Sequence, residues 1–118
     1  MLSLPGDARV FLCLTPVDMR LGFDRLASLV SEAMGENPLS GQLFVFPSRR
    51  RDRVKILYWD RDGLALWYKR LERGTFPFPA PEGSPVLTIT SMELSALLEG
   101  VNPLAVRKLG KSRRFSLP

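Results

Sequence analysis

Residues 43–74 constrain the fold most, because they combine two apolar strands with a tight turn between them. Apolar residues alternate with others along 53–60, Asp62 and Gly63 suit the centre of a type I′ turn, and 64–71 return as the second strand. The sequence therefore predicts an antiparallel hairpin, around which the other elements have to pack.

The predicted register of this hairpin places two cations directly opposite each other. With a two-residue turn Lys55 faces Arg70, and with a three-residue turn it faces Lys69. Like charges in such positions destabilise a hairpin by some tenths of a kcal/mol, up to about 1. We therefore expect a phosphate near these side chains, where it would compensate their charge.

Aromatic residues of the hairpin lie beside these cations. Trp59 and Tyr68 share the face that carries Lys55 and Arg70, so we expect both to be partly exposed next to positive charge. Such a pair resembles a stacking platform for unpaired bases. The alternative is that both side chains bury under the proline-rich segment after the hairpin, because large aromatic residues usually bury.

Positive charge is concentrated in two segments. The net charge of the chain is +5, but residues 49–55 hold five cations and one aspartate, residues 107–114 hold five cations and no acid, and the rest sum to −4. Such patches are typical of nucleic-acid binding, although a solvated loop and a disordered basic tail would have the same composition. The candidate binding cations are Arg49, Arg50, Arg51, Arg53, Lys55, Lys69, Arg70, Arg107, Lys108, Lys111, Arg113 and Arg114.

The segment before the hairpin predicts a strand, a long helix and a second strand. Residues 9–14 predict the first strand, because every residue after Arg9 in this range is apolar. Thr15 as N-cap and Asp18 three residues later predict a helix over 15–34, along which apolar residues recur at three- and four-residue steps. Residues 42–46 then form the second strand.

We expect this helix to pack on the more apolar face of the hairpin. That face consists of Val54, Ile56, Tyr58, Trp67 and Leu71. Gly22 weakens the helix by about 1 kcal/mol relative to alanine. A close approach to the sheet would explain a glycine at this position.

The segment after the hairpin predicts either an edge segment or a covering loop, followed by short elements. Residues 76–85 contain four prolines, which exclude a central strand because proline cannot donate to the ladder. A short strand is predicted at 86–90, and Thr90 with Glu93 forms a capping box for a helix that ends before residue 100. A third, short helix is predicted over 102–109.

Few residues of the chain suit catalysis. There is no histidine, which removes Ser-His and Cys-His relays and most zinc sites, and the single Cys13 lies in an apolar run where we expect it to fill the core. A two-metal nuclease needs clustered carboxylates, and the nearest acidic pair, Asp60 and Asp62, is explained by the turn. Arg20 and Arg25 fit ordinary surface ion pairs. We therefore predict no enzymatic activity, no metal site and no cofactor.

Four segments resemble one known family. They are DMRLGFDRLASLV at 18–30, GQLFVF at 41–46, RRRDRVKILYWDRDGLALWYKRLERGTF at 49–76 and LSALLEG at 94–100. In this order they are similar to TnpB, the small accessory protein of the insertion-sequence-sixty-six transposon family, which is not the RNA-guided nuclease of that name. The resemblance implies a role in bacterial transposition beside a larger transposase and a helix-turn-helix accessory protein, and it carries over no catalytic residue. The segment after residue 100 departs from the family pattern.

We predict a single domain over residues 1–118 of the α+β class: a mainly antiparallel sheet with one long helix packed on a face, a second short helix, and a flexible basic tail over 107–118. Because no signal-peptide pattern and no membrane-spanning apolar run occurs, we expect a cytoplasmic protein. The expected function is a non-catalytic transposition accessory protein that binds nucleic acid, transposon DNA in particular. The alternative is an adaptor that binds the transposase or the other accessory protein through exposed apolar and aromatic surface.

Overall fold

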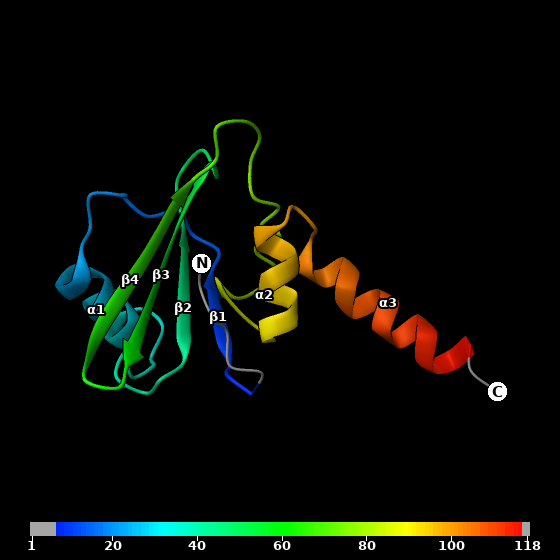
Figure 1. Cartoon of the computed structure of the whole chain (residues 1–118), viewed down its shortest axis with the longest axis horizontal. Helices are drawn as coiled ribbons and strands as arrows, with labels where there is room; N and C mark the ends of the chain where they lie inside the picture. The colour runs from blue at the N-terminus through cyan, green and yellow to red at the C-terminus, as the bar shows by residue number, and fades with distance from the viewer. Residues whose placement is uncertain (1–6, 117–118) are drawn as a thin grey trace.

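The computed structural model describes the backbone of residues 7–116 and the side chains of residues 7–109. Within these residues, five strands form one sheet, two helices pack on its two faces, and a third helix points away from it (Figure 1). The elements are β1 (Val10–Cys13), α1 (Phe23–Glu32), β2 (Leu43–Pro47), β3 (Arg53–Asp60), β4 (Gly63–Arg70), β5 (Val86–Ile89), α2 (Ser91–Leu98) and α3 (Pro103–Ser116). Across the sheet the strand order is β4-β3-β2-β1-β5. Only β1 and β2 pair in parallel among these strands, so the predicted α+β class with a mainly antiparallel sheet is confirmed.

The central strands β1 and β2 are covered on both faces of the sheet. Their apolar runs are continuous, as expected for strands without a solvent face. One core layer, on the α1 side, contains Phe11, Leu26, Val30, Phe44, Phe46 and Leu57. The other layer contains Val10, Leu12, Val45, Ile56, Phe76, Phe78, Leu94 and Leu97, from the strands, α2 and the proline-rich segment. That segment therefore covers the sheet, as the prolines predicted.

The long helix predicted over 15–34 is wrong, because α1 comprises ten residues, Phe23–Glu32. The preceding backbone makes other hydrogen bonds: the Val17 N–H donates to the Pro47 carbonyl at 2.9 Å, and the Asp18 carboxylate accepts the Arg20 N–H at 2.8 Å. Gly22 is the N-cap of α1 and not an interior residue. A Cβ built on Gly22 meets nothing within 4 Å, so close packing does not explain this glycine.

The helix also lies on the other face from the one we predicted. Val54, Ile56 and Trp67 belong to the layer that α2 and the proline-rich segment cover, whereas α1 packs with Leu57. The chain connects the parallel strands β1 and β2 through α1, and such crossovers are almost always right-handed. Handedness therefore selects the face, and apolar content cannot, because both faces are apolar.

The hairpin register differs from the predicted one by two residues. The turn residues are Arg61 and Asp62, so Arg53 faces Arg70 and Lys55 faces Tyr68. The predicted opposition of Lys55 to another cation is therefore wrong. A shift of two residues keeps each side chain on its face, so the hydrophobic pattern alone does not distinguish the two registers.

The first of the two C-terminal helices begins at its predicted cap. At the start of α2, the Thr90 hydroxyl accepts from the Glu93 N–H and the Glu93 carboxylate accepts from the Thr90 N–H, which is the predicted capping box. The α3 backbone extends to Ser116, further than the short helix we predicted, and it points away from the sheet (Figure 1). The expected flexibility of residues 107–118 stays a prediction. No helix in the described chain is both long and apolar enough to cross a membrane.

Candidate nucleic-acid interface

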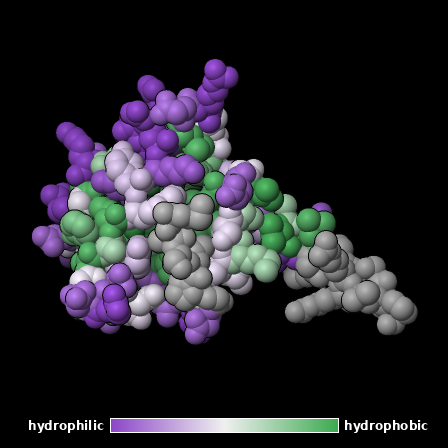
Figure 2. Space-filling view, in the orientation of Figure 1, coloured by the Kyte–Doolittle hydropathy of each residue, from purple (hydrophilic) through white to green (hydrophobic). Residues whose placement is uncertain are grey.

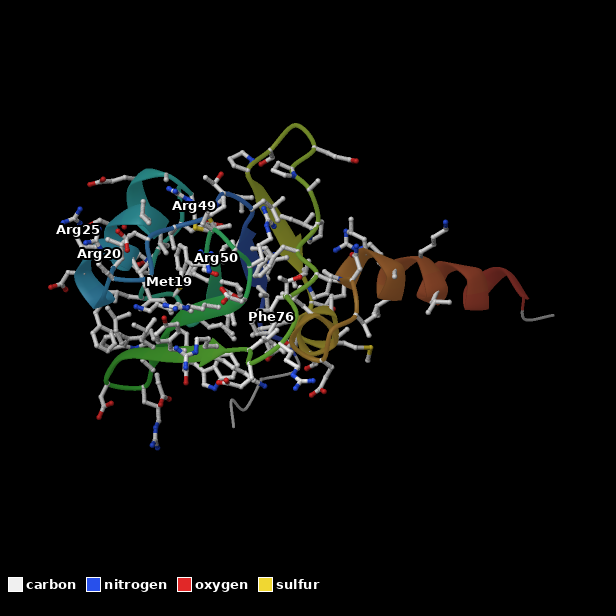
Figure 3. The ribbon with its side chains drawn as sticks, turned by 90° about the horizontal axis from the view of Figure 1, so that it is seen from above. Met19, Arg20, Arg25, Arg49, Arg50 and Phe76 are labelled. Carbon is white, nitrogen blue, oxygen red and sulfur yellow. The ribbon has the colours of Figure 1, made fainter. Side chains whose placement is uncertain are left out.

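Two loops, residues 14–22 and 48–52, meet at one end of the sheet, where β1 and β2 end and β3 begins. They enclose an open hollow of about 450 Å³, which we call the arginine hollow. Its lining residues are Pro16, Val17, Asp18, Met19, Arg20, Ser48, Arg49, Arg50, Asp52 and Arg53. Hydrophilic residues gather at this end of the molecule (Figure 2). Figure 3 labels Arg20, Arg49 and Arg50, which lie on the part of the molecule far from α3.

The loop that carries Arg49 and Arg50 is fixed by a buried serine. The Ser48 hydroxyl accepts from the Arg53 N–H at 3.0 Å and donates to the Asp52 carboxylate at 3.1 Å. The Ser48 carbonyl accepts a hydrogen bond from the Arg51 N–H at 3.0 Å. This bond closes a turn with Arg49 and Arg50 at its centre. Both arginines are exposed, and neither forms an ion pair with any described residue.

Asp18 and Arg20 form the opposite wall of the hollow. The Arg20 Nη2 donates to the Asp18 carboxylate at 2.7 Å, as in the surface pair we predicted. Hydrogen bonds from the Arg20 side chain and backbone, helped by the more distant charge of Arg49, lower the pKa of Asp18 to about 2. That Arg20 faces the basic loop was not predicted from the sequence. Asp18 could have indicated it, because an aspartate also forms local turns, and here its carboxylate accepts the Arg20 N–H instead of capping a helix.

Three of the predicted binding cations are used within the fold. Lys55 is 7% exposed, and its Nζ donates to the carbonyls of Met19 and Leu21. Arg51 turns away from the hollow, with its guanidinium carbon 5.8 Å from the centre of the Phe78 ring. Arg107 donates to Glu93 at 2.8 Å. The placement of these three side chains does not fit a primary phosphate contact.

The other predicted cations lie at different positions on the surface. Arg70 faces Arg53 at the end of the hairpin and lies 3.8 Å from Glu72. Lys69 is exposed and sits opposite Val54, so it projects from the opposite face. Lys108 is exposed on α3, and the side chains of Lys111, Arg113 and Arg114 lie outside the described residues. The structure therefore brings Arg49, Arg50 and Arg53 together, with Arg70 beside them.

The two aromatic candidates do not form one platform. Tyr68 is 47% exposed, its hydroxyl accepts from Arg53 Nη1 at 3.4 Å, and its ring centre is 4.7 Å from Lys55 Nζ. Trp59 is half-buried and faces Leu64. Trp59 lies four residues further along β3 than Lys55, the residue opposite Tyr68, which is a separation of about 13 Å. Both are partly exposed, as expected, and neither lies under the proline-rich segment, which covers the other face.

The acidic and thiol groups occupy structural positions. Asp60 and Asp62 lie at the hairpin turn, at the end of the sheet away from the hollow. Burial raises the pKa of the Cys13 thiol, which packs against the α1-side core and is not a ready nucleophile. Among the described residues, no group of three or more His, Cys, Asp or Glu side chains is arranged to hold a metal ion.

The fold and the hollow together define a small α+β domain with an arginine-lined surface at one end of its sheet. The family model described as IS66 Orf2 like protein matches residues 8–108, and the chain belongs to this family. This confirms the resemblance drawn from the sequence and supports a transposition accessory role. Two relatives from Sinorhizobium fredii, called uncharacterized proteins y4hO and y4jC, are 40% and 37% identical, covering 86% and 85% of this chain and 88% and 85% of theirs. No solved structure matches the chain.

Proposed function

We propose that this protein is a non-catalytic transposition accessory factor that binds the phosphate backbone of nucleic acid in the arginine hollow. The observation that supports it best is a hydrogen-bonded turn that carries two exposed arginines, Arg49 and Arg50, without ion-pair partners among the described residues. Guanidinium groups match phosphate oxygens in bidentate geometry. Transposon DNA is the expected nucleic acid. The expected protein partners are the transposase and the second accessory protein of the same transposable element.

Folding stability gives no reason for this arrangement. Exposed arginines contribute little to the free energy of unfolding, and neighbouring cations repel each other. A bound phosphate would remove that repulsion, and the fixed turn would reduce the entropy lost on binding. Both oxygens of the Asp18 carboxylate accept from the Arg20 guanidinium, so a metal ion would have to displace that cation, which supports a binding role over metal-assisted cleavage.

A second candidate function is a protein adaptor. An apolar groove of about 260 Å³ lies beside the hollow and shares Pro16 and Val17 with it. Leu29, Met34 and Val86 are among its other lining residues. An apolar side chain of the transposase or of the other accessory protein would fit such a groove. This function predicts no salt-dependent affinity of the isolated protein for DNA.

Fluorescence anisotropy with labelled transposon-end DNA, duplex and single-stranded, at several salt concentrations tests the proposal. The double variant Arg49→Ala, Arg50→Ala should flatten the slope of log affinity against log salt by about 0.9 for each lost duplex contact, or about 0.7 on a single strand. The control is Arg25→Ala, Arg61→Ala, which removes the same charge from exposed positions outside the hollow. Equal slopes for the two double variants would refute the site.

A further inference from the structure

A buried lysine holds one wall of the arginine hollow. Lys55 is 7% exposed, and no described carboxylate forms an ion pair with it. Its Nζ instead donates to the Met19 carbonyl at 2.6 Å and the Leu21 carbonyl at 2.8 Å, beside the ring of Tyr68. A buried ammonium without a counter-ion is unfavourable, and an apolar side chain of similar length would avoid this desolvation. The burial of Lys55 therefore calls for a reason other than core packing.

The two carbonyls that Lys55 binds belong to the residues on either side of Arg20. The Arg20 N–H is also fixed, because it donates to the Asp18 carboxylate at 2.8 Å. The guanidinium donates from Nε at 3.0 Å and from Nη2 at 2.7 Å to the same carboxylate. Two groups from two segments, the Asp18 carboxylate and the Lys55 ammonium, thus hold the backbone around Arg20, and the carboxylate also holds its side chain.

The held guanidinium still has donors to offer. The Arg20 side chain is 91% exposed, and its Nη1 has no hydrogen-bond partner among the described residues. One edge of the guanidinium contacts Asp18, which leaves the Nη1 edge open to a second anion. An exposed ion pair such as this adds little to stability, whereas a guanidinium fixed in advance loses less entropy when it binds a phosphate.

We infer that Arg20 is a phosphate-binding residue of the arginine hollow and that Lys55 is its positioning residue. The inference rests on the proposed function, and it names the phosphate groups of a nucleic-acid backbone as the ligand. The open edge of Arg20 binds phosphate oxygens from one wall while Arg49 and Arg50 bind from the other. Lys55 does not touch the nucleic acid. Through its hydrogen bonds to the carbonyls of Met19 and Leu21, it holds the backbone in the position from which Arg20 lines the hollow.

The first test compares Arg20→Ala with the control Arg25→Ala. Arg25 is a nearby arginine of α1 that is also exposed but does not line the hollow, so each variant removes one exposed positive charge. With labelled duplex DNA, Arg20→Ala should flatten the salt slope by about 0.9 and Arg25→Ala should leave it unchanged. If the two variants have equal slopes while Arg49→Ala, Arg50→Ala has a flatter one, the inference is wrong and the proposed function stands. If the Arg49, Arg50 variant also keeps its slope, both are wrong.

The second test measures the coupling between Lys55 and Arg20. In a Lys55→Met background, replacing Arg20 by alanine should weaken DNA binding by a smaller factor than it does in the parent protein, because Arg20 is no longer held. The loss caused by Arg49→Ala, Arg50→Ala should be the same in both backgrounds, which a general loss of folding would not give. Circular dichroism establishes that the variants are folded, and Lys55→Gln, which keeps a donor for one carbonyl, replaces Lys55→Met if that variant unfolds. An equal effect of Arg20→Ala in both backgrounds would overturn the positioning role.

Discussion

Glu93 joins two helices, and its removal should destabilise the protein measurably. Its side chain is 6% exposed and accepts hydrogen bonds from Arg107 at 2.8 and 3.0 Å and from the Thr90 N–H at 2.8 Å. Glu93→Ala keeps the bond from its own N–H to the Thr90 hydroxyl and loses the one that the Thr90 N–H donates, and the loss of such a hydrogen bond destabilises by about 1 kcal/mol. Loss of an ion pair whose arginine is partly exposed adds about 1 kcal/mol, more than a surface pair and less than a fully buried one. We expect Glu93→Ala to lower the free energy of unfolding by about 2 kcal/mol.

Urea unfolding followed by circular dichroism measures this change. A double-mutant cycle with Arg107→Ala should give a coupling of about 1 kcal/mol, which reports the ion pair apart from the cap. Glu99→Ala, which removes an exposed acid at the other end of α2, should change stability little. A coupling near zero would refute the view that this ion pair holds α3 to α2.

The contribution of Glu93 should depend on pH with a definite sign. Burial raises the pKa of Glu93, but hydrogen bonds from Arg107 and from Thr90 outweigh burial and hold the pKa below its ordinary value of 4.5. A carboxylate with a lowered folded pKa stabilises the fold above the unfolded pKa and loses that contribution as the pH falls through the folded one. The difference between the parent and Glu93→Ala at pH 7 should therefore shrink as the pH is lowered below 4.5.

Two further predictions concern chemistry and the basic helix. The purified protein should neither cut nor join DNA with magnesium or manganese, because the acidic pair Asp60 and Asp62 lies at a hairpin turn away from the hollow. Metal-dependent cleavage that disappears in Asp60→Ala, Asp62→Ala would overturn the proposal of a non-catalytic role. Truncation after Leu109, which keeps the Arg107–Glu93 ion pair, should weaken DNA binding alike for all sequences and mainly at low salt. Competition between transposon-end and scrambled DNA measures the sequence preference of the full-length and truncated proteins. If truncation abolishes the preference for the ends, the residues that recognise the sequence lie on α3.

Elements with local causes could be predicted from the sequence. The capping box of α2 needs only Thr90 and Glu93, three residues apart, and it is present. The β3 bounds follow from alternation along 53–60, and the prolines excluded residues 76–85 from the sheet centre because proline has no N–H to donate. The density of cations at 49–53 likewise pointed to the loop that lines the hollow.

Features with long-range causes needed the tertiary structure. Nothing local distinguishes the two hairpin registers, because a shift of two residues preserves both faces, and the handedness of the β1–α1–β2 crossover decides where α1 packs. Lys55 reads as one more exposed cation of the basic segment, yet its partners are carbonyls 34 and 36 residues earlier in the chain. Arg20 faces the basic loop only because residues 14–22 fold over the end of the sheet instead of continuing a helix. The sequence by itself thus determined the local elements and the sign of the charge, while the packing of distant segments decided which arginines line the hollow.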